Sequence, residues 1–204
     1  MINKKHERLL SFFIGSSGYL VPRPLNEYVK ISKTMHPYVL GKRNNFYFYN
    51  LEKSLYGIRA TLEILKNIIA SGGNIFFVSD SLRLKSRFML DPNIDFIKWK
   101  RGSLVQSQDV DLILLTPVNK ENLVEAHRKS SLIVGVGSST MSKISYPINL
   151  NIESAVLADW LLGSLYKSYT QGKRMRNKKN KSNNNNNLLG KGLLKKRFKQ
   201  YNEV

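Results

Sequence analysis

The residues in this sequence that favour a chemical role are cations beside aromatic side chains. Lys98-Trp99-Lys100-Arg101 interleaves one ring with three cations, and Lys42-Arg43-Asn44-Asn45 lies directly before Phe46-Tyr47-Phe48-Tyr49. Cations pair with phosphates, and aromatic rings stack on exposed bases. The two segments therefore predict contact with RNA. For the aromatics at 46–49, burial in a core is an equal explanation, because alternation in a strand would bury two of the four.

The charge of the whole chain also predicts a polyanionic partner. Its 204 residues contain 33 Lys and Arg against 14 Asp and Glu, which gives a net charge of +19 and a pI near 10.1. Residues 167–204 hold 12 of the cations and one acid. Residues 170–187 have too few apolar groups to offset the entropy of ordering them, so we expect them to be disordered when free. The spacing of Leu194, Phe198 and Tyr201 predicts a short basic helix beyond them.

Residues suited to catalysis or metal binding are scarce. The chain has no cysteine, which excludes disulfides, thiolate metal sites and cysteine nucleophiles. His6, His36 and His127 lie in separate segments without a metal-ligand spacing. Asp80 is the single carboxylate at a predicted strand end, where stabilising a turn is the simpler role. We therefore expect no enzyme activity, no metal and no cofactor.

A phosphate cradle is the remaining alternative at the strand ends. Gly135-Val136-Gly137-Ser138-Ser139-Thr140 follows a predicted strand, but it lacks the third glycine of a dinucleotide motif and the Gly-Lys ending of a P-loop. The alternative function is a phosphosugar-binding or isomerase-like α/β enzyme with an anion site at the carboxyl ends of the strands. That site would use Ser79, Asp80, Ser138, Ser139 and Thr140.

Membrane binding is the third candidate. No apolar run approaches the ~20 residues that a membrane-spanning helix requires, so we expect no membrane insertion. Residues 188–201 have the composition of a short basic segment that could lie on anionic lipid, but the segment contains Gly190 and Gly192. RNA remains the favoured partner.

Hydrophobic periodicity predicts alternating helices and strands. Asn50 can cap a helix that ends at Ser71-Gly72-Gly73, with an apolar stripe of Leu55, Ile58, Leu62, Leu65 and Ile69. Further helices are predicted at 81–89, 119–128 and 151–165. Continuously apolar runs at 74–78, 110–115 and 132–136 predict strands covered on both faces, hence parallel.

The fold class that this pattern predicts is α/β: a doubly wound, mainly parallel sheet in a flavodoxin- or Rossmann-like three-layer sandwich, with a basic, extended C-terminal tail. We divide the chain into an N-terminal arm at 1–29, an α/β domain at 30–166 and an Asn- and Lys-rich tail at 167–204.

Three blocks of the sequence carry a resemblance to a known family. Residues 35–44 followed by Asn50-Leu51-Glu52-Lys53-Ser54 match, in order and spacing, a block of Pro, apolar residues, Gly, x-Arg-Asn, an extended stretch and Asn-Leu-Glu-Lys-Thr. Residues 98–104 are similar to Arg-Trp-Leu-Gly-Gly-Thr-Leu. Residues 146–155 are similar to Tyr-Pro-Ile-Pro-Gly-Asn-Asp-x-x-Ala. These are blocks of the ribosomal protein S-two family of the small subunit, and the resemblance covers about residues 30–166.

The resemblance implies a non-enzymatic α/β protein, fixed to small-subunit rRNA on the solvent side near the junction of head and body. It implies neighbouring small-subunit proteins as further partners and no independent homo-oligomer. By position in the family blocks, the residues expected to contact rRNA are Lys42, Arg43, Asn44, Lys98 and Trp99. Local charge adds Arg83, Lys85, Lys100 and Arg101, and the tail adds Lys173, Arg174, Arg176, Lys178 and Lys179.

The departures from the family indicate a mitochondrial form. The family carries a long helical hairpin where this chain has only Ser103–Gln108. Gly15-Ser16-Ser17-Gly18 stands at its Gly-x-His-Phe-Gly-His motif, and Ser81-Leu82 at a Lys-Arg/Gln pair. The chain is also rich in Lys, Asn, Ile, Tyr and Phe, the residues of A/T-rich codons. We therefore expect a protein of the mitochondrial matrix, in the small subunit of the mitoribosome, and the A/T-rich codon bias is compatible with a gene in the organelle.

Overall fold

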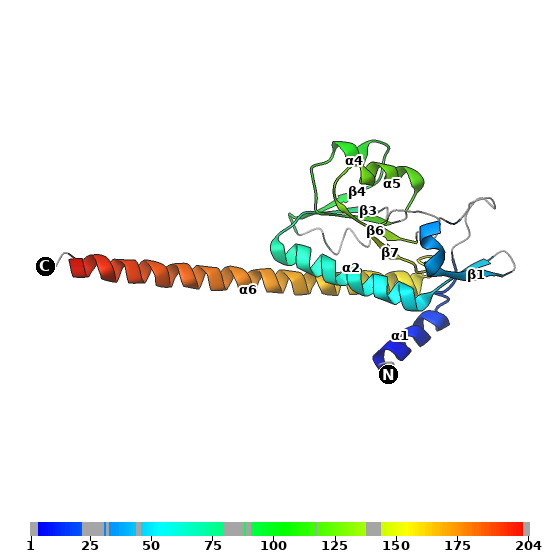
Figure 1. The fold of residues 1–204 in the computed structure, drawn as a ribbon, viewed down its shortest axis with the longest axis horizontal. Coiled ribbons are helices and arrows are strands. Elements are labelled where there is room, and N and C mark those ends of the chain that lie inside the picture. Colours follow the sequence, from blue (N-terminus) through cyan, green and yellow to red (C-terminus); the bar gives the residue numbers. More distant parts are fainter. Residues whose placement is uncertain are drawn as a thin grey trace.

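The computed structural model describes residues 4–21, 31, 33–43, 46–79, 88, 91–116, 118–137 and 144–201, with side chains described as far as residue 180. Its elements, in chain order, are α1 Lys4–Gly15, the 3-10 helix η1 Lys33–Tyr38, β1 Val39–Arg43, β2 Phe46–Tyr49, α2 Leu51–Ser71, β3 Ile75–Ser79, β4 Ile94–Ile97, α4 Ser103–Gln106, β5 Leu112–Thr116, α5 Lys120–His127, β6 Leu132–Val136, β7 Tyr146–Ile148 and α6 Ala155–Tyr201. Figure 1 shows α2 and α6 on one side of the main sheet and α4 and α5 on the other.

The main sheet has five strands, all parallel, in the order β4-β3-β5-β6-β7. Counted from the first strand of the sheet, this order is 2-1-3-4-5, which is the flavodoxin-like arrangement. The chain therefore winds outward in both directions from β3 and β5, and the predicted doubly wound α/β fold is confirmed. A separate antiparallel hairpin is formed by β1 and β2.

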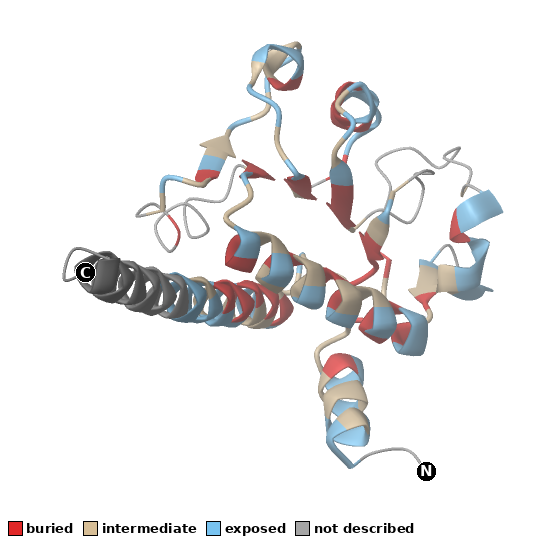
Figure 2. Cartoon of the chain, turned by 60° about the vertical axis from the view of Figure 1, so that its left-hand side comes forward, coloured by how far each residue is buried: buried red, intermediate tan, exposed pale blue. Residues whose placement is uncertain are grey.

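The apolar strands face two cores. In β3, Ile75 and Phe77 pack on the α2 and α6 side, whereas Phe76 and Val78 pack on the α4 and α5 side. All four side chains are buried, and Figure 2 shows buried residues along the strands and on the inward faces of the helices. A strand covered on both faces needs apolar residues at consecutive positions, which explains why the strands lack alternation.

Helix α2 begins and ends where the sequence predicts. The Lys53 N–H donates to Asn50 Oδ1 at 3.2 Å, so Asn50 caps the first turn. At the other end Gly72 takes a left-handed φ of 86°, and the Gly72 N–H donates to the Ile69 carbonyl at 3.1 Å. The cap fixes where α2 starts relative to the β1–β2 hairpin, which lies directly before it in the chain.

Helix α6 differs from the prediction. It begins at Ala155 and continues to Tyr201, so the chain is helical across the expected boundary at 166/167 and through 170–187, which we expected to be disordered. Tertiary packing is the reason for the continuation past 166: Tyr169 is 6% exposed in the core, and Gly172 lies so close to α2 that an added Cβ would be 2.6 Å from the Lys66 carbonyl oxygen. Beyond these contacts α6 extends away from the body (Figure 1).

Two short edge strands, β4 and β7, were not predicted, and of the predicted helix at 81–89 only Phe88 lies within the described residues. Phe88 is buried and stacks on Phe77, with ring centroids 5.2 Å apart. Phe88 therefore belongs to the core on the α2 and α6 side.

Replacing Gly57 tests the close approach of α2 to the sheet. A Cβ at Gly57 would lie 2.5 Å from the Pro147 carbonyl oxygen in β7, so Gly57→Ala should lower the free energy of unfolding by about 1–3 kcal/mol. Gly163 in α6 has no atom within 4 Å of its Cβ position, so Gly163→Ala should instead raise it by roughly 0.5–1 kcal/mol. Urea unfolding followed by circular dichroism measures both, and equal effects would contradict the packing.

Candidate nucleic-acid interface

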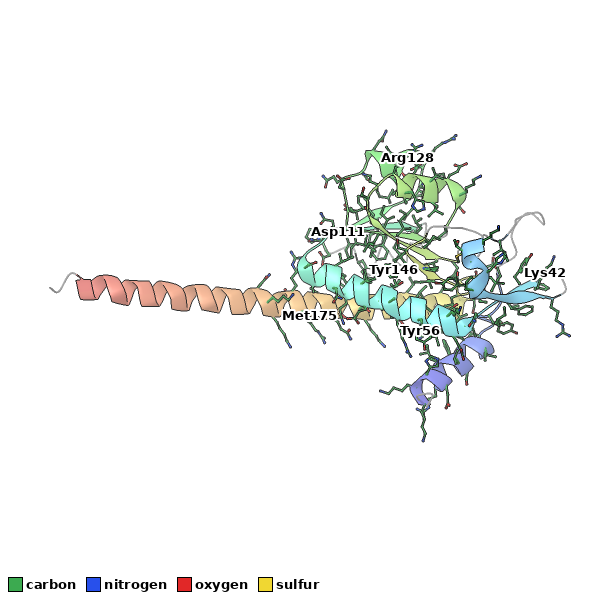
Figure 3. All side chains as sticks on the ribbon, viewed as in Figure 1. Lys42, Tyr56, Asp111, Arg128, Tyr146 and Met175 are labelled. Carbon is green, nitrogen blue, oxygen red and sulfur yellow. The ribbon has the colours of Figure 1, made fainter. Side chains whose placement is uncertain are left out.

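The β1–β2 hairpin carries the first pair of predicted RNA contacts. Lys42 and Arg43 are both exposed at the end of β1, and they pair in register with Tyr47 and Phe46. The Lys42 ammonium lies 5.6 Å from the centroid of the Tyr47 ring. Figure 3 shows Lys42 at one extremity of the molecule, directed away from the body. Asn44 lies outside the described residues.

The hairpin aromatics divide between core and surface. Tyr49 is fully buried, and Phe48 stacks on Tyr19 with centroids 5.9 Å apart. Phe46, at 37% exposure, is the ring of 46–49 that is most open to solvent. Burial therefore accounts for part of the aromatic run, and Phe46 remains beside the exposed cations.

The segment after β4 carries the second group. Lys98, Lys100 and Arg101 are exposed, whereas Trp99 is half-buried and packs against the core under α4 and α5. The Trp99 Nε1 is buried and has no hydrogen-bond partner among the described residues. The ring is thus less open for base stacking than we expected, and its main role in the structure is to anchor the segment that presents the three cations.

A turn and one carboxylate hold Arg101 in position. The Ser103 N–H donates to the Lys100 carbonyl at 2.9 Å, and Gly102 takes a left-handed φ of 87°. The Gly102 N–H then donates to Glu125 Oε1 at 2.7 Å, and the Leu104 N–H to Glu125 Oε2 at 3.3 Å. Glu125 is 8% exposed, and its two hydrogen bonds tie α5 to the start of α4.

A groove of about 540 Å³ lies between α4 and α5 beside this turn. Arg101 from the turn and Lys120 and Arg128 from α5 and its C-terminal cap bring cations to its walls. Sequence reasoning missed Lys120 and Arg128. Their signal was the spacing of Lys120, Val124 and Arg128, which puts all three on one helix face, but only the tertiary structure sets that face against α4.

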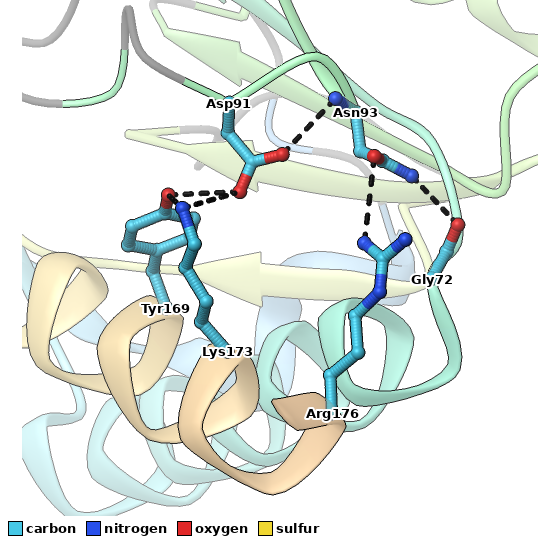
Figure 4. Close-up of polar contacts among 6 residues, drawn as sticks. All are labelled: Gly72, Asp91, Asn93, Tyr169, Lys173 and Arg176. Atoms are coloured by element: carbon cyan, nitrogen blue, oxygen red, sulfur yellow. Dashed lines mark hydrogen bonds and ion pairs between the residues drawn. The ribbon is translucent and has the colours of Figure 1, made fainter. Parts of the chain in front are cut away.

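The tail cation Lys173 has partners within the chain. The Tyr169 hydroxyl donates to Asp91 Oδ2 at 2.8 Å, and the Lys173 ammonium lies 3.3 Å from the Tyr169 hydroxyl and 3.5 Å from Asp91 Oδ2 (Figure 4). This cluster joins α6 to the loop before β4. It explains why α6 stays attached to the body past residue 165.

Arg176 makes a second contact with the same loop. Its Nη1 donates to Asn93 Oδ1 at 3.4 Å, and the Asn93 side-chain amide donates to the Gly72 carbonyl at 2.7 Å (Figure 4). Two of the five predicted tail contacts are therefore engaged in holding α6. The other three are exposed: Arg174, Lys178 and Lys179.

The cluster around Asp91 shifts three pKa values. Burial tends to raise the pKa of the Asp91 carboxyl, but the hydrogen bonds from Asn93 and Tyr169 and the charge of Lys173 outweigh it and lower that pKa below its usual value. Burial and the hydrogen bond to Asp91 raise the pKa of Tyr169. The hydrogen bond to Tyr169 raises the pKa of Lys173. A charged carboxylate, a neutral phenol and an ammonium are thus the forms favoured near neutral pH.

The predicted cations lie in three separate groups. Three labelled residues in Figure 3 mark the regions that carry these groups. Lys42 marks the hairpin end, Arg128 marks the side of α4 and α5, and Met175 marks α6 toward the opposite end. Arg83 and Lys85 lie outside the described residues. The predicted cations are therefore spread over separate parts of the molecule, and only Arg101 among those described lies at the α4–α5 groove.

The alternative anion site is described only in part. Ser79 and Thr116 are in register at the carboxyl ends of β3 and β5, where the two directions of winding meet. The other residues of that proposal lie outside the described part of the chain: Asp80, Ser138, Ser139 and Thr140.

The sequence matches no protein-family model, and no match is found among curated proteins. No helix in the described part of the chain has the length and apolarity needed to cross a membrane. Within the same residues, no three His, Cys, Asp or Glu side chains gather in a way that could hold a metal ion. Function therefore has to be argued from the charge, the fold and the surface.

Neutralising Asp91 tests the attachment of α6. Because the folded pKa of Asp91 lies below its ordinary value of 3.8, its contribution to stability is present above that pH and is lost as the pH falls through the folded pKa. Asp91→Asn should lower the free energy of unfolding by about 1–3 kcal/mol at pH 6 to 7, and the difference from wild type should shrink below pH ~4.

The matched control is Asp109→Asn, since Asp109 is fully exposed and lies 3.5 Å from the Lys129 ammonium. It should leave both the stability and its pH dependence nearly unchanged. Urea unfolding of wild type, Asp91→Asn and Asp109→Asn between pH 3 and 7 measures the free energy of unfolding of each protein at each pH. A pH-independent difference for Asp91→Asn would rule out the charge as its cause.

Proposed function

We propose that this chain is a structural protein of the small ribosomal subunit, a member of the ribosomal protein S-two family, in the mitochondrial matrix. It binds small-subunit rRNA near the junction of head and body, contacts neighbouring small-subunit proteins, and supports subunit assembly and translation. It has no catalytic activity in this proposal.

The observation that carries the proposal is the distribution of cations over separate exposed surfaces. Exposed basic side chains occur on the hairpin (Lys42 and Arg43), after β4 (Lys98, Lys100 and Arg101) and on α6 (Arg174, Lys178 and Lys179). An enzyme that binds a small anion needs cations at one cleft only, whereas exposed cations in this chain also lie on the hairpin and on α6, away from the α4–α5 groove. A protein enclosed by folded RNA meets phosphates on several faces at once, and a net charge of +19 suits that environment.

The family-like residues support the proposal through what they do in this fold. Asn50 caps α2 directly after the hairpin, and the Ser54 hydroxyl donates to the Asn50 carbonyl at 2.9 Å. Helix α2 packs closely on β7, where the Pro147 carbonyl lies against Gly57. The matched blocks thus set the position of the hairpin cations relative to the sheet.

The connection between β4 and β5 agrees with a shortened family member. Between Ile97 and Leu112 the only regular element is α4, a helix of four residues. The long helical hairpin that the family carries there would not fit in this interval. In this chain the α4–α5 groove described above lies beside this short connection.

Removing the hairpin cations tests the proposal. The double variant Lys42→Ala/Arg43→Ala should lower incorporation of the tagged protein into small ribosomal subunits by roughly three- to tenfold, because two phosphate contacts are lost. Both side chains are exposed, so the thermal unfolding midpoint should not change.

The control variant Lys4→Ala/Arg8→Ala removes the same charge from the exposed face of α1. Quantifying each tagged protein in the small-subunit fraction gives the comparison. Wild-type protein that never enters this fraction would refute the ribosomal function. Equal incorporation of the two double variants would refute the role of the hairpin.

A further inference from the structure

We infer that the groove between α4 and α5 is a binding site for the sugar-phosphate backbone of single-stranded or irregular RNA, with Arg101, Lys120 and Arg128 as the phosphate contacts. The inference rests on the proposed function and deepens it. It assigns Lys120 and Arg128, which neither the charge runs of the sequence nor its family resemblance single out, and it names what the groove takes.

The three cations are available for a ligand. Arg101, Lys120 and Arg128 are exposed, and among the described residues none of their charged side-chain groups has an ion-pair or hydrogen-bond partner. Figure 3 shows Arg128 directed outward above α5. Three unpaired cations around one groove repel one another, and an anion between them removes that cost.

The nearby acids do not neutralise this site. Glu125 directs its carboxylate inward to the amides of Gly102 and Leu104. Glu121 is the one exposed acid among the residues lining the groove. Lys129 is not counted as a phosphate contact of the groove, because its ammonium donates to the carbonyls of Ser107 and Gln108. The groove therefore keeps an excess of positive charge.

The groove also has apolar walls, which argue for a nucleic-acid chain over an isolated phosphate. Val105 from α4 and Val124 from α5 line it and are 46% and 48% exposed. A volume of about 540 Å³ exceeds what one phosphate fills, and apolar walls suit the sugar and the base faces. Phosphates would meet the cations while sugars and bases cover the two valines.

Exposed cations outside the groove extend the surface on which the RNA strand would lie. Lys98 and Lys100 are exposed in the segment that leads to Arg101. Trp99 packs against the core and the Gly102 N–H donates to Glu125, so the backbone of this segment is attached to the body on both sides of Lys100. A preorganised row of cations loses little conformational entropy on binding.

The test measures binding of full-length protein to a labelled oligouridylate of about 12 nucleotides, within the usual site size for single strands. The triple variant Arg101→Ala/Lys120→Ala/Arg128→Ala should bind at least about tenfold more weakly near 0.1 M salt. Its plot of log affinity against log salt should be shallower by about 2, since each phosphate contact on a single strand contributes about 0.7.

The matched control is Lys4→Ala/Arg8→Ala/Lys53→Ala, which removes the same charge from exposed positions on α1 and α2. Val124→Asp is a second variant, which keeps every cation and adds a carboxylate to the groove wall. It should weaken binding several-fold. Thermal unfolding of each variant checks that the fold is intact.

The outcomes separate the groove from the proposed function. If wild type binds RNA and enters small subunits while the triple variant retains the affinity and salt slope of the control, the groove inference is overturned and the ribosomal function stands. If wild type shows no salt-dependent binding to the oligouridylate, the groove inference fails, and incorporation into small subunits decides the proposed function separately. Loss in the triple variant and in Val124→Asp, with the control near wild type, supports the groove.

Discussion

The position of α2 is the constraint on which the rest of the structure depends. Gly57 lets α2 approach β7, where a Cβ would lie 2.5 Å from the Pro147 carbonyl oxygen, and Gly172 lets α6 approach α2, where a Cβ would lie 2.6 Å from the Lys66 carbonyl oxygen. The hairpin precedes α2 directly, and β3 follows it after Gly72 and Gly73. Because side chains larger than hydrogen do not fit at either contact, the sheet, the hairpin and the long helix α6 have their relative positions set by one helix.

Acids and bases have different roles in this basic protein. Several carboxylates accept hydrogen bonds inside the fold: Asp91 ties α6 to the loop before β4, Asp111 accepts the Asn74 N–H at 2.9 Å, and Glu125 joins α4 to α5. Many of the cations are at the surface instead, on the hairpin, around the α4–α5 groove and along α6. These carboxylates stabilise the scaffold, whereas the surface cations are exposed to solvent. The fold thereby holds separated basic surfaces at fixed distances from one another.

The sequence predicted the parts of the fold whose signals are local. The stripe of α2 and its Asn50 cap follow from periodicity and composition, and so do the strands predicted at 74–78, 110–115 and 132–136, which the structure has at 75–79, 112–116 and 132–136. Edge strand β4 was not predicted because its exposed Asp95 interrupts the apolar run. The continuation of α6 past residue 166 was not predicted because the contacts that hold it are distant in sequence. Tyr169 and Lys173 contact Asp91, Arg176 contacts Asn93, and Gly172 packs on α2. The groove cations Lys120 and Arg128 were missed for the same reason, since only the turn at Gly102 brings Arg101 to them.

We propose that this chain is an integral, rRNA-bound component of the small ribosomal subunit. The most direct measurement is to sediment an organelle lysate through sucrose gradients at low and at high salt and to follow the chain by mass spectrometry against small-subunit rRNA. A protein held by phosphate contacts on several faces should stay with the small subunit at high salt, because separate contacts must break together for it to leave. Recovery of the chain only in the soluble fractions at both salt concentrations would contradict the account.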